Sequence, residues 1–147
     1  VASELGGPDV AIGIQADVTD EGQVADAIRA TILAFGGIDL VVNNAGLSIS
    51  KPLLETTAED FDRLMAVNLR GTFLVGREGL RAMVKQKRGR VINIASELAY
   101  LGRAEFSVYC ASKGAVVGAG VRARHPGQCH RPRPRGYAAA RPREHEC

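Results

Sequence analysis

The chain has 147 residues, 46% hydrophobic and 24% charged, as in one ordinary globular domain, and no apolar run approaches the roughly 18 residues that span a membrane. The net charge of +3 is unevenly distributed, because residues 1–117 carry 12 Lys and Arg against 14 Asp and Glu, whereas residues 118–147 carry seven Arg against two Glu. The three cysteines form no CxxC pair, so the sequence predicts no metal site and favours a reducing, cytoplasmic setting.

The first predicted elements are a strand and a helix. Residues 9–18 form an apolar run with β-branched side chains, which predicts a strand. Thr19 or Asp20 can cap the helix that follows, because short polar side chains accept hydrogen bonds from the first turn. Apolar residues recur at helical spacing until Gly36-Gly37, which predicts the end of this helix.

A second strand and a long helix follow. The stretch IDLVVNNAG, residues 38–46, is too apolar to be exposed on either face, which predicts a buried parallel strand. After a loop containing Pro52, residues 55–89 predict one long helix. Thr56 or Thr57 is its expected cap, with acidic residues in the first turn and KQKR in the last.

A third buried strand, residues 90–96, and a helix over residues 107–117 complete the predicted order. Strand–helix repeats imply right-handed crossovers and a doubly wound parallel sheet of the α/β class. Ligands in such sheets bind at the carboxyl ends of the strands. Polar residues fall at the end of each predicted strand, which predicts one shared site: Asp17, Asn43, Asn44 and Ser96.

Tyr109 and Lys113 lie four residues apart in the stretch YCASK, so on a helix they share one face. A phenol ionises at about pH 10, and a nearby ammonium stabilises the phenolate and suits it to proton transfer near neutral pH. Ser96 can bind a substrate carbonyl oxygen beside this pair. The alternative is an ordinary amphipathic helix and a turn serine, and the spacing alone leaves both interpretations open.

Other candidate residues also allow a structural interpretation. Asn68 falls inside the predicted long helix, where it can bend the helix, hold a water molecule or face solvent. Asn43 and Gly46 end a buried strand, where amides can tie neighbouring strands together and the glycine can turn the chain. Asp17 can serve as a helix cap.

Five motifs, ADV, NNAG, VNLRGTF, INIAS and YCASK, resemble in order and spacing the classical short-chain dehydrogenases/reductases. The resemblance covers residues 1–117, and SELAYLGRAEFSVYCASKGAV looks most similar to the 3-oxoacyl-[acyl-carrier-protein] reductase branch. It implies a Rossmann-like fold and an NAD(P)-dependent oxidoreductase that interconverts a carbonyl and a secondary alcohol. The implied substrate is a small carbonyl or alcohol compound or an acyl thioester.

The same resemblance implies roles for individual residues. Tyr109 protonates the carbonyl oxygen, Lys113 favours the phenolate and binds the nicotinamide ribose, Ser96 orients the substrate oxygen, and Asn68 holds a water molecule in the proton relay. The implied cofactor contacts are Asp17, Val18, Asn43, Ala45, Gly46, Tyr109 and Lys113. The cofactor is NADP or NAD, with NADP slightly preferred.

The sequence departs from the family pattern at both ends. The family opens with a strand and a TGxxxGxG turn that holds the pyrophosphate, and neither this unit nor the family's second strand is present here. The C-terminal strands are absent as well. We therefore expect an incomplete sheet and an isolated chain that is unstable and inactive.

The basic C-terminal segment, residues 118–147, is rich in Arg and Pro and contains no Leu, Ile or Phe, which predicts disorder. Two interpretations stay open. The favoured interpretation is that this segment is translated from a shifted reading frame. The other is a non-enzymatic truncated fold whose basic arm binds nucleic acid or another polyanion. The family resemblance disfavours nucleic acid as a partner and implies a homo-oligomer, dimer or tetramer, through the long helices at residues 57–88 and 107–117.

Overall fold

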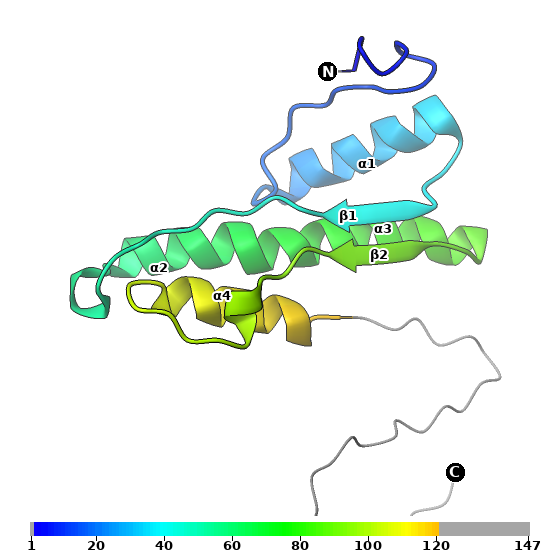
Figure 1. Ribbon diagram of the computed structural model, residues 1–147. Coiled ribbons are helices and arrows are strands. Elements are labelled where there is room, and N and C mark those ends of the chain that lie inside the picture. The colour runs from blue at the N-terminus through cyan, green and yellow to red at the C-terminus, as the bar shows by residue number, and fades with distance from the viewer. Residues whose placement is uncertain (1, 121–147) are drawn as a thin grey trace, which may run out of the picture.

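Two parallel strands lie at the centre of the computed structural model, which describes residues 2–120 (Figure 1). Strand β1 (Leu40–Asn43) pairs with β2 (Arg90–Asn93), with Leu40 opposite Arg90 and Asn43 opposite Asn93. The parallel pair with its crossover helix confirms the predicted α/β, Rossmann-like class. Beyond Gly120 the predicted basic arm lies outside the described residues.

Helix α1 (Glu21–Phe35) begins and ends where the local signals predict. The Asp20 side chain accepts a hydrogen bond from the backbone N of Gln23, so Asp20 is the N-cap. Gly36 adopts a left-handed φ of 79°, a conformation that glycine reaches without strain, and this ends the helix.

The predicted long helix is present but has a widened turn within it. A short 3₁₀ turn, η1 (Leu53–Glu55), leads to α2 (Ala58–Met65), which Thr57 caps through a reciprocal capping box with Asp60. The π-helical turn η2 (Ala66–Gly71) follows and continues into α3 (Thr72–Gln86). Such π turns are rare and occur frequently at functional sites.

Helix α4 (Ser107–Gly118) confirms the helix predicted over residues 107–117. It follows β2 through the 3₁₀ turn η3 (Glu97–Ala99) and a loop. The helix packs against η3, against α2 and against the π turn η2. This packing places the YCASK stretch next to Asn68.

The strand predicted for residues 9–18 is wrong. Residues 8–10 form a turn, and residues 11–17 are irregular. A strand needs a neighbouring strand to satisfy its backbone hydrogen bonds, and β1 and β2 are the only strands among the described residues. Apolar β-branched side chains alone therefore did not make this segment a strand.

The core lies between the strands and α3. Val41, Ile38 and Met83 form its buried centre, and Val91 packs against them. Side chains that alternate with Val41 along β1 point the other way, and Leu40 and Val42 are 51% and 49% exposed. Within residues 2–120, α3 thus covers one face of the sheet and leaves apolar side chains of the other face accessible.

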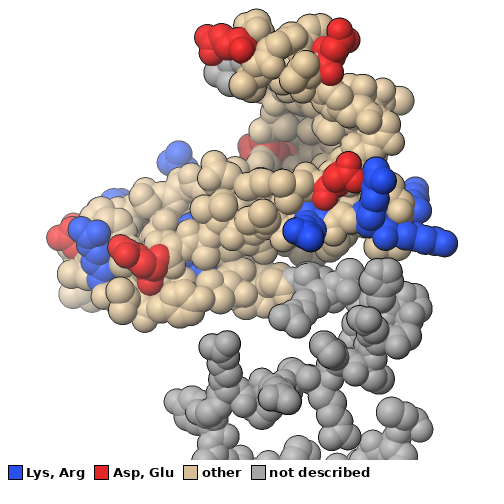
Figure 2. Space-filling view, turned by 45° about the vertical axis from the view of Figure 1, so that its right-hand side comes forward, with Lys and Arg blue, Asp and Glu red and all other residues tan. Residues whose placement is uncertain are grey.

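Basic side chains gather at the amino end of β2, next to the end of α3 (Figure 2). They are Lys85, Lys87, Arg88 and Arg90. Arg88 forms an ion pair with Asp39 at 2.8 Å. The cluster lies at the end of the strands opposite to the polar residues described next. Among the described residues, no helix combines the length and the apolar character needed to cross a membrane.

Candidate active site

Asn68 is the centre of a buried hydrogen-bond network at the carboxyl end of β1. Its side chain is 1% exposed. Its Oδ1 accepts a hydrogen bond from the backbone N of Leu47 at 2.9 Å, and its Nδ2 donates to the carbonyl oxygen of Leu47 at 2.9 Å. The same Nδ2 donates to Ser112 Oγ at 3.0 Å. Asn68 therefore joins the loop after β1 to helix α4.

Lys113 reaches from α4 to the end of β2. Its Nζ donates to the carbonyl oxygen of Ile94 at 2.8 Å. The residue is 6% exposed, and this burial lowers the pKa of its ammonium group below the ordinary value. The Nζ lies 5.9 Å from the centre of the Tyr109 ring. The structure thus places Lys113 and Tyr109 on the same side of α4.

Tyr109 is half-buried on the first turns of α4. Its ring packs edge-to-face against Phe106, with 6.2 Å between the ring centres. Its backbone carbonyl accepts a hydrogen bond from Ser112 Oγ at 2.8 Å. Packing and backbone contacts therefore fix the turn that carries the phenol.

Gly46 lies against both Asn68 and Lys113. A Cβ atom added to Gly46 would lie 3.2 Å from Asn68 Oδ1 and 3.5 Å from Lys113 Nζ. Gly46 and the preceding Ala45 are exposed, so the backbone of this turn faces outward while its inner side touches the two polar groups. Three predicted site residues from separate elements are thus brought together.

Ser96 caps the short turn η3. Its Oγ accepts a hydrogen bond from the backbone N of Leu98 at 3.2 Å, as the turn interpretation predicts. A hydroxyl group that accepts in this way still carries a hydrogen that it can donate. Because η3 packs against α4, Ser96 lies on an element that borders the helix of Tyr109.

Asn43 ties the two strands together at their carboxyl ends. Its Nδ2 donates to Asn93 Oδ1 at 2.8 Å and to the carbonyl oxygen of Thr72 at 3.3 Å. Thr72 Oγ1 in turn donates to the carbonyl oxygen of Asn68 at 2.7 Å. The amide of Asn43 thus acts as the structural interpretation predicts, and Thr72 connects it to the Asn68 network.

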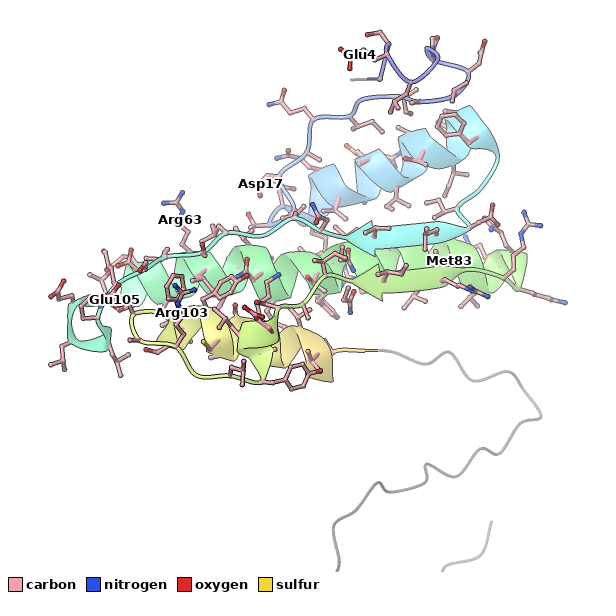
Figure 3. All side chains as sticks on the ribbon, in the orientation of Figure 1. Glu4, Asp17, Arg63, Met83, Arg103 and Glu105 are labelled. Carbon is pink, nitrogen blue, oxygen red and sulfur yellow. The ribbon has the colours of Figure 1, made fainter. Side chains whose placement is uncertain are left out.

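Asp17 lies in the loop before α1, close to the start of that helix (Figure 3), and Val18 follows it in the chain. Asp17 is exposed, and its Oδ1 accepts hydrogen bonds from the backbone N and the Oγ1 of Thr19, which lower the pKa of this carboxyl group. Val18 packs closely on Gly71, where an added Cβ would lie 2.8 Å from Val18 Cγ2. Val18 therefore contacts η2, whereas Asp17 is bonded to Thr19 and, through its backbone N, to Gln23 of α1.

Several residues of the site carry little signal in the sequence. Leu47 and Ile94 take part through backbone atoms alone, so their side chains give no indication of it. Asn93 pairs with Asn43 in the parallel register, and the Asn that each of the second and third predicted strands contains was a usable signal. Ser112 is part of YCASK, but its partner Asn68 is 44 residues away in the sequence.

The arrangement offers a phenol, an ammonium group, a hydroxyl and a carboxamide around an outward-facing turn at the carboxyl ends of two parallel strands. Such groups can transfer a proton to an oxygen atom and can bind hydroxyl groups. Among residues 2–120, no group of three or more His, Cys, Asp or Glu is placed to hold a metal ion.

The sequence profile described as short chain dehydrogenase matches residues 1–128. The chain therefore belongs to the short-chain dehydrogenase/reductase family. It is 46% identical over 112 residues to the 2-(R)-hydroxypropyl-CoM dehydrogenase of Xanthobacter autotrophicus. The matched residues cover 74% of this chain and 45% of that protein.

Two solved structures resemble the chain closely. ElxO with NADP bound superposes with a TM-score of 0.68 at 38% identity, over 71% of this chain and 42% of that one. An NAD⁺-bound xylitol dehydrogenase gives the same TM-score at 34% identity, over 70% and 40% of the two chains. The chain spans 41–50% of the length of the first curated relatives it matches.

Proposed function

We propose that this chain carries the proton-transfer residues of an NAD(P)-dependent oxidoreductase that interconverts a carbonyl and a secondary alcohol. The observation that supports this most strongly is the pairing of Tyr109 and Lys113 on one side of α4. The ammonium group of Lys113 is buried against the carbonyl of Ile94, and its Nζ lies 5.9 Å from the phenol ring. Family membership and relatives solved with NADP and NAD⁺ agree with this chemistry.

In this proposal Tyr109 donates its phenolic proton to the substrate oxygen during reduction and accepts it back during oxidation. Lys113 stabilises the phenolate electrostatically, and Ser96 donates its free hydroxyl hydrogen to the same oxygen. Asn68 fixes the loop after β1 and holds a water molecule in the proton relay. A bound nicotinamide supplies or accepts the hydride.

The residues fit the ribose end of a nicotinamide dinucleotide. Lys113 and Tyr109 offer polar groups for ribose hydroxyls, and the exposed turn at Ala45 and Gly46 lets a ligand approach the backbone. We propose Asp17 and Val18 as adenine contacts. We propose that Asn43 lines the cofactor's path and braces the sheet. NADP is slightly preferred over NAD. The sequence contains no TGxxxGxG motif, so no group is assigned to the pyrophosphate.

Within the class of carbonyl compounds, we propose a 3-oxoacyl thioester as the substrate, because of the stretch SELAYLGRAEFSVYCASKGAV.

We also propose a cytoplasmic protein that forms a homo-oligomer through α2, α3 and α4. Phe61, Phe73 and Val117 are 44%, 54% and 39% exposed on these helices, so apolar surface is available for such contacts. Light scattering of Phe73→Glu beside the unmodified chain tests the assembly.

A chimera tests the proposed chemistry most directly. The aligned segment of this chain replaces its counterpart in the Xanthobacter 2-(R)-hydroxypropyl-CoM dehydrogenase, and the product is assayed for that enzyme's dehydrogenase activity. Measurable turnover by the chimera supports the proposal. A chimera that folds and binds the dinucleotide but shows no turnover with that substrate or with 3-oxoacyl thioesters contradicts it.

The isolated 147-residue chain is assayed beside the chimera. We expect no turnover of NADPH or NADH with 3-oxoacyl thioesters above the blank, because its sequence contains no TGxxxGxG motif to hold the pyrophosphate. Clear turnover by the isolated chain would refute this expectation of inactivity while supporting the proposed chemistry.

A further inference from the structure

Ser112 has a completely buried hydroxyl, 0% exposed, to which the roles above assign nothing. Its Oγ contacts two groups: it accepts from Asn68 Nδ2 at 3.0 Å and donates to the carbonyl oxygen of Tyr109 at 2.8 Å. It thus lies between the π turn and the helical turn that carries the phenol.

The direction of each hydrogen bond in this network is fixed by the groups at its two ends. The backbone N–H of Leu47 can only donate, so the oxygen of the Asn68 amide must face it. The amide nitrogen of Asn68 then faces Ser112 and donates, which occupies the hydroxyl oxygen as an acceptor. The carbonyl of Tyr109 can only accept, so the Ser112 hydrogen points to it.

We propose that Ser112 is a positioning residue that holds α4 in register with the π turn and so keeps Lys113, and Tyr109 with it, beside the turn at Gly46. The catalytic meaning of this position rests on the function proposed above. Lys113 follows Ser112 directly, and Tyr109 lies one helical turn before it, so a shift of this turn moves both groups. Every polar atom of the bridge is paired, and a fully satisfied buried network favours one arrangement.

The test uses the full 147-residue chain and two NMR measurements that need no turnover. The first is hydrogen exchange of the Asn68 side-chain amide, and the second is the nuclear Overhauser effect between the Gly46 Hα atoms and the Lys113 side chain, which lie on different elements. In Ser112→Ala we expect the Asn68 amide to exchange about tenfold faster, because one of its hydrogens loses its buried acceptor. We also expect the Gly46–Lys113 effect to weaken, because α4 shifts against the loop after β1.

Two variants separate this role from a general loss of stability. Ser112→Thr keeps the hydroxyl and should retain both signals even where its extra methyl group lowers stability. Val24→Ala removes buried side-chain volume in α1, away from the network, and should lower stability without changing either signal. Where Ser112→Ala does not fold, Ser112→Cys replaces it, because sulfur is a weaker acceptor of similar shape.

Each outcome decides the inference. Faster exchange together with a weakened Gly46–Lys113 effect supports it. Unchanged exchange shows that the bridge does not hold Asn68, and faster exchange with an intact Gly46–Lys113 effect shows that it does not position α4; either result overturns the inference. Failure of the proposed chemistry would appear in the chimera assay and would leave both NMR signals as they are.

Discussion

Lys113 Nζ donates to the carbonyl oxygen of Ile94 at 2.8 Å, so a side chain from α4 closes the end of β2. The bond gives a buried ammonium group a partner, which it needs because an unpaired buried charge is costly. It also fixes the position from which Lys113 faces Tyr109.

The burial of Lys113 makes stability depend on pH at the alkaline end. Its pKa is lowered in the folded protein below the ordinary value of 10.5, so the unfolded chain holds this proton more tightly. Folding therefore carries a penalty at neutral pH that disappears as the pH rises through the lowered pKa toward 10.5. We expect the free energy of unfolding of the wild type to rise relative to that of Lys113→Met over this range.

Urea unfolding at a series of pH values measures that difference. Lys85→Met is the control, because Lys85 is an exposed lysine in the last turn of α3. The pH dependence of its unfolding free energy should run parallel to that of the wild type. Identical pH slopes for the wild type and Lys113→Met would show that Lys113 is not desolvated by folding.

Gly46→Ala should place a methyl group against the side chains of Asn68 and Lys113. The new Cβ would lie 3.5 Å from Lys113 Nζ, which is an ordinary contact, but 3.2 Å from Asn68 Oδ1, so the hydrogen-bonded Asn68 side chain must move by a few tenths of an ångström. We expect a loss of about 1–3 kcal/mol in the free energy of unfolding, as for other crowded substitutions. Gly13→Ala is the control, since no atom lies within 4 Å of a Cβ at that position. Equal stability of the two variants would contradict the close approach at Gly46.

Asn43→Ala should separate the carboxyl ends of the strands. It removes the bond to Asn93 and leaves the half-buried Asn93 oxygen without this donor, which costs about 1–3 kcal/mol. Asn44→Ala is a matched control in the next position, where the side chain is exposed. Chemical unfolding checks both variants, and a cost for Asn44→Ala as large as that for Asn43→Ala would refute the bridging role.

Asn68→Asp keeps the shape of the side chain but replaces its donating amide nitrogen with an accepting oxygen. A carboxylate oxygen would face the carbonyl oxygen of Leu47 at the 2.9 Å now spanned by a donated hydrogen bond. We expect a loss of at least about 1–3 kcal/mol near neutral pH, partly recovered in acid where the carboxyl group is protonated and can donate. Thermal unfolding at two pH values measures it. A loss independent of pH would exclude this arrangement of the amide.

Local signals in the sequence were sufficient for several elements. Asp20 caps α1, Gly36 ends it, and Thr57 begins the long helix, because capping depends on residues a few positions apart. The spacing of Tyr109 and Lys113 likewise needed only one helical turn. The strand expected at residues 9–18 failed because strand formation depends on a neighbour that residue composition does not specify.

Long-range contacts account for what the sequence did not predict. Neither the residue types nor the apolar periodicity of residues 66–71 indicates that this turn is π-helical and not α-helical. Leu47 and Ile94 enter the site through backbone atoms, which every residue has. The pairing of Ser112 with Asn68 becomes visible only when α4 packs against the π turn.

The measurement that tests the central claim is the effect of Tyr109→Phe on kcat/KM in the chimera. The variant removes only the phenolic oxygen, and loss of a positioned acid–base group lowers rates by about 10²–10⁴-fold. We predict a loss of that size for Tyr109→Phe and an unchanged kcat/KM for Tyr100→Phe, whose side chain is 76% exposed. A Tyr109→Phe chimera as active as its parent would contradict the account.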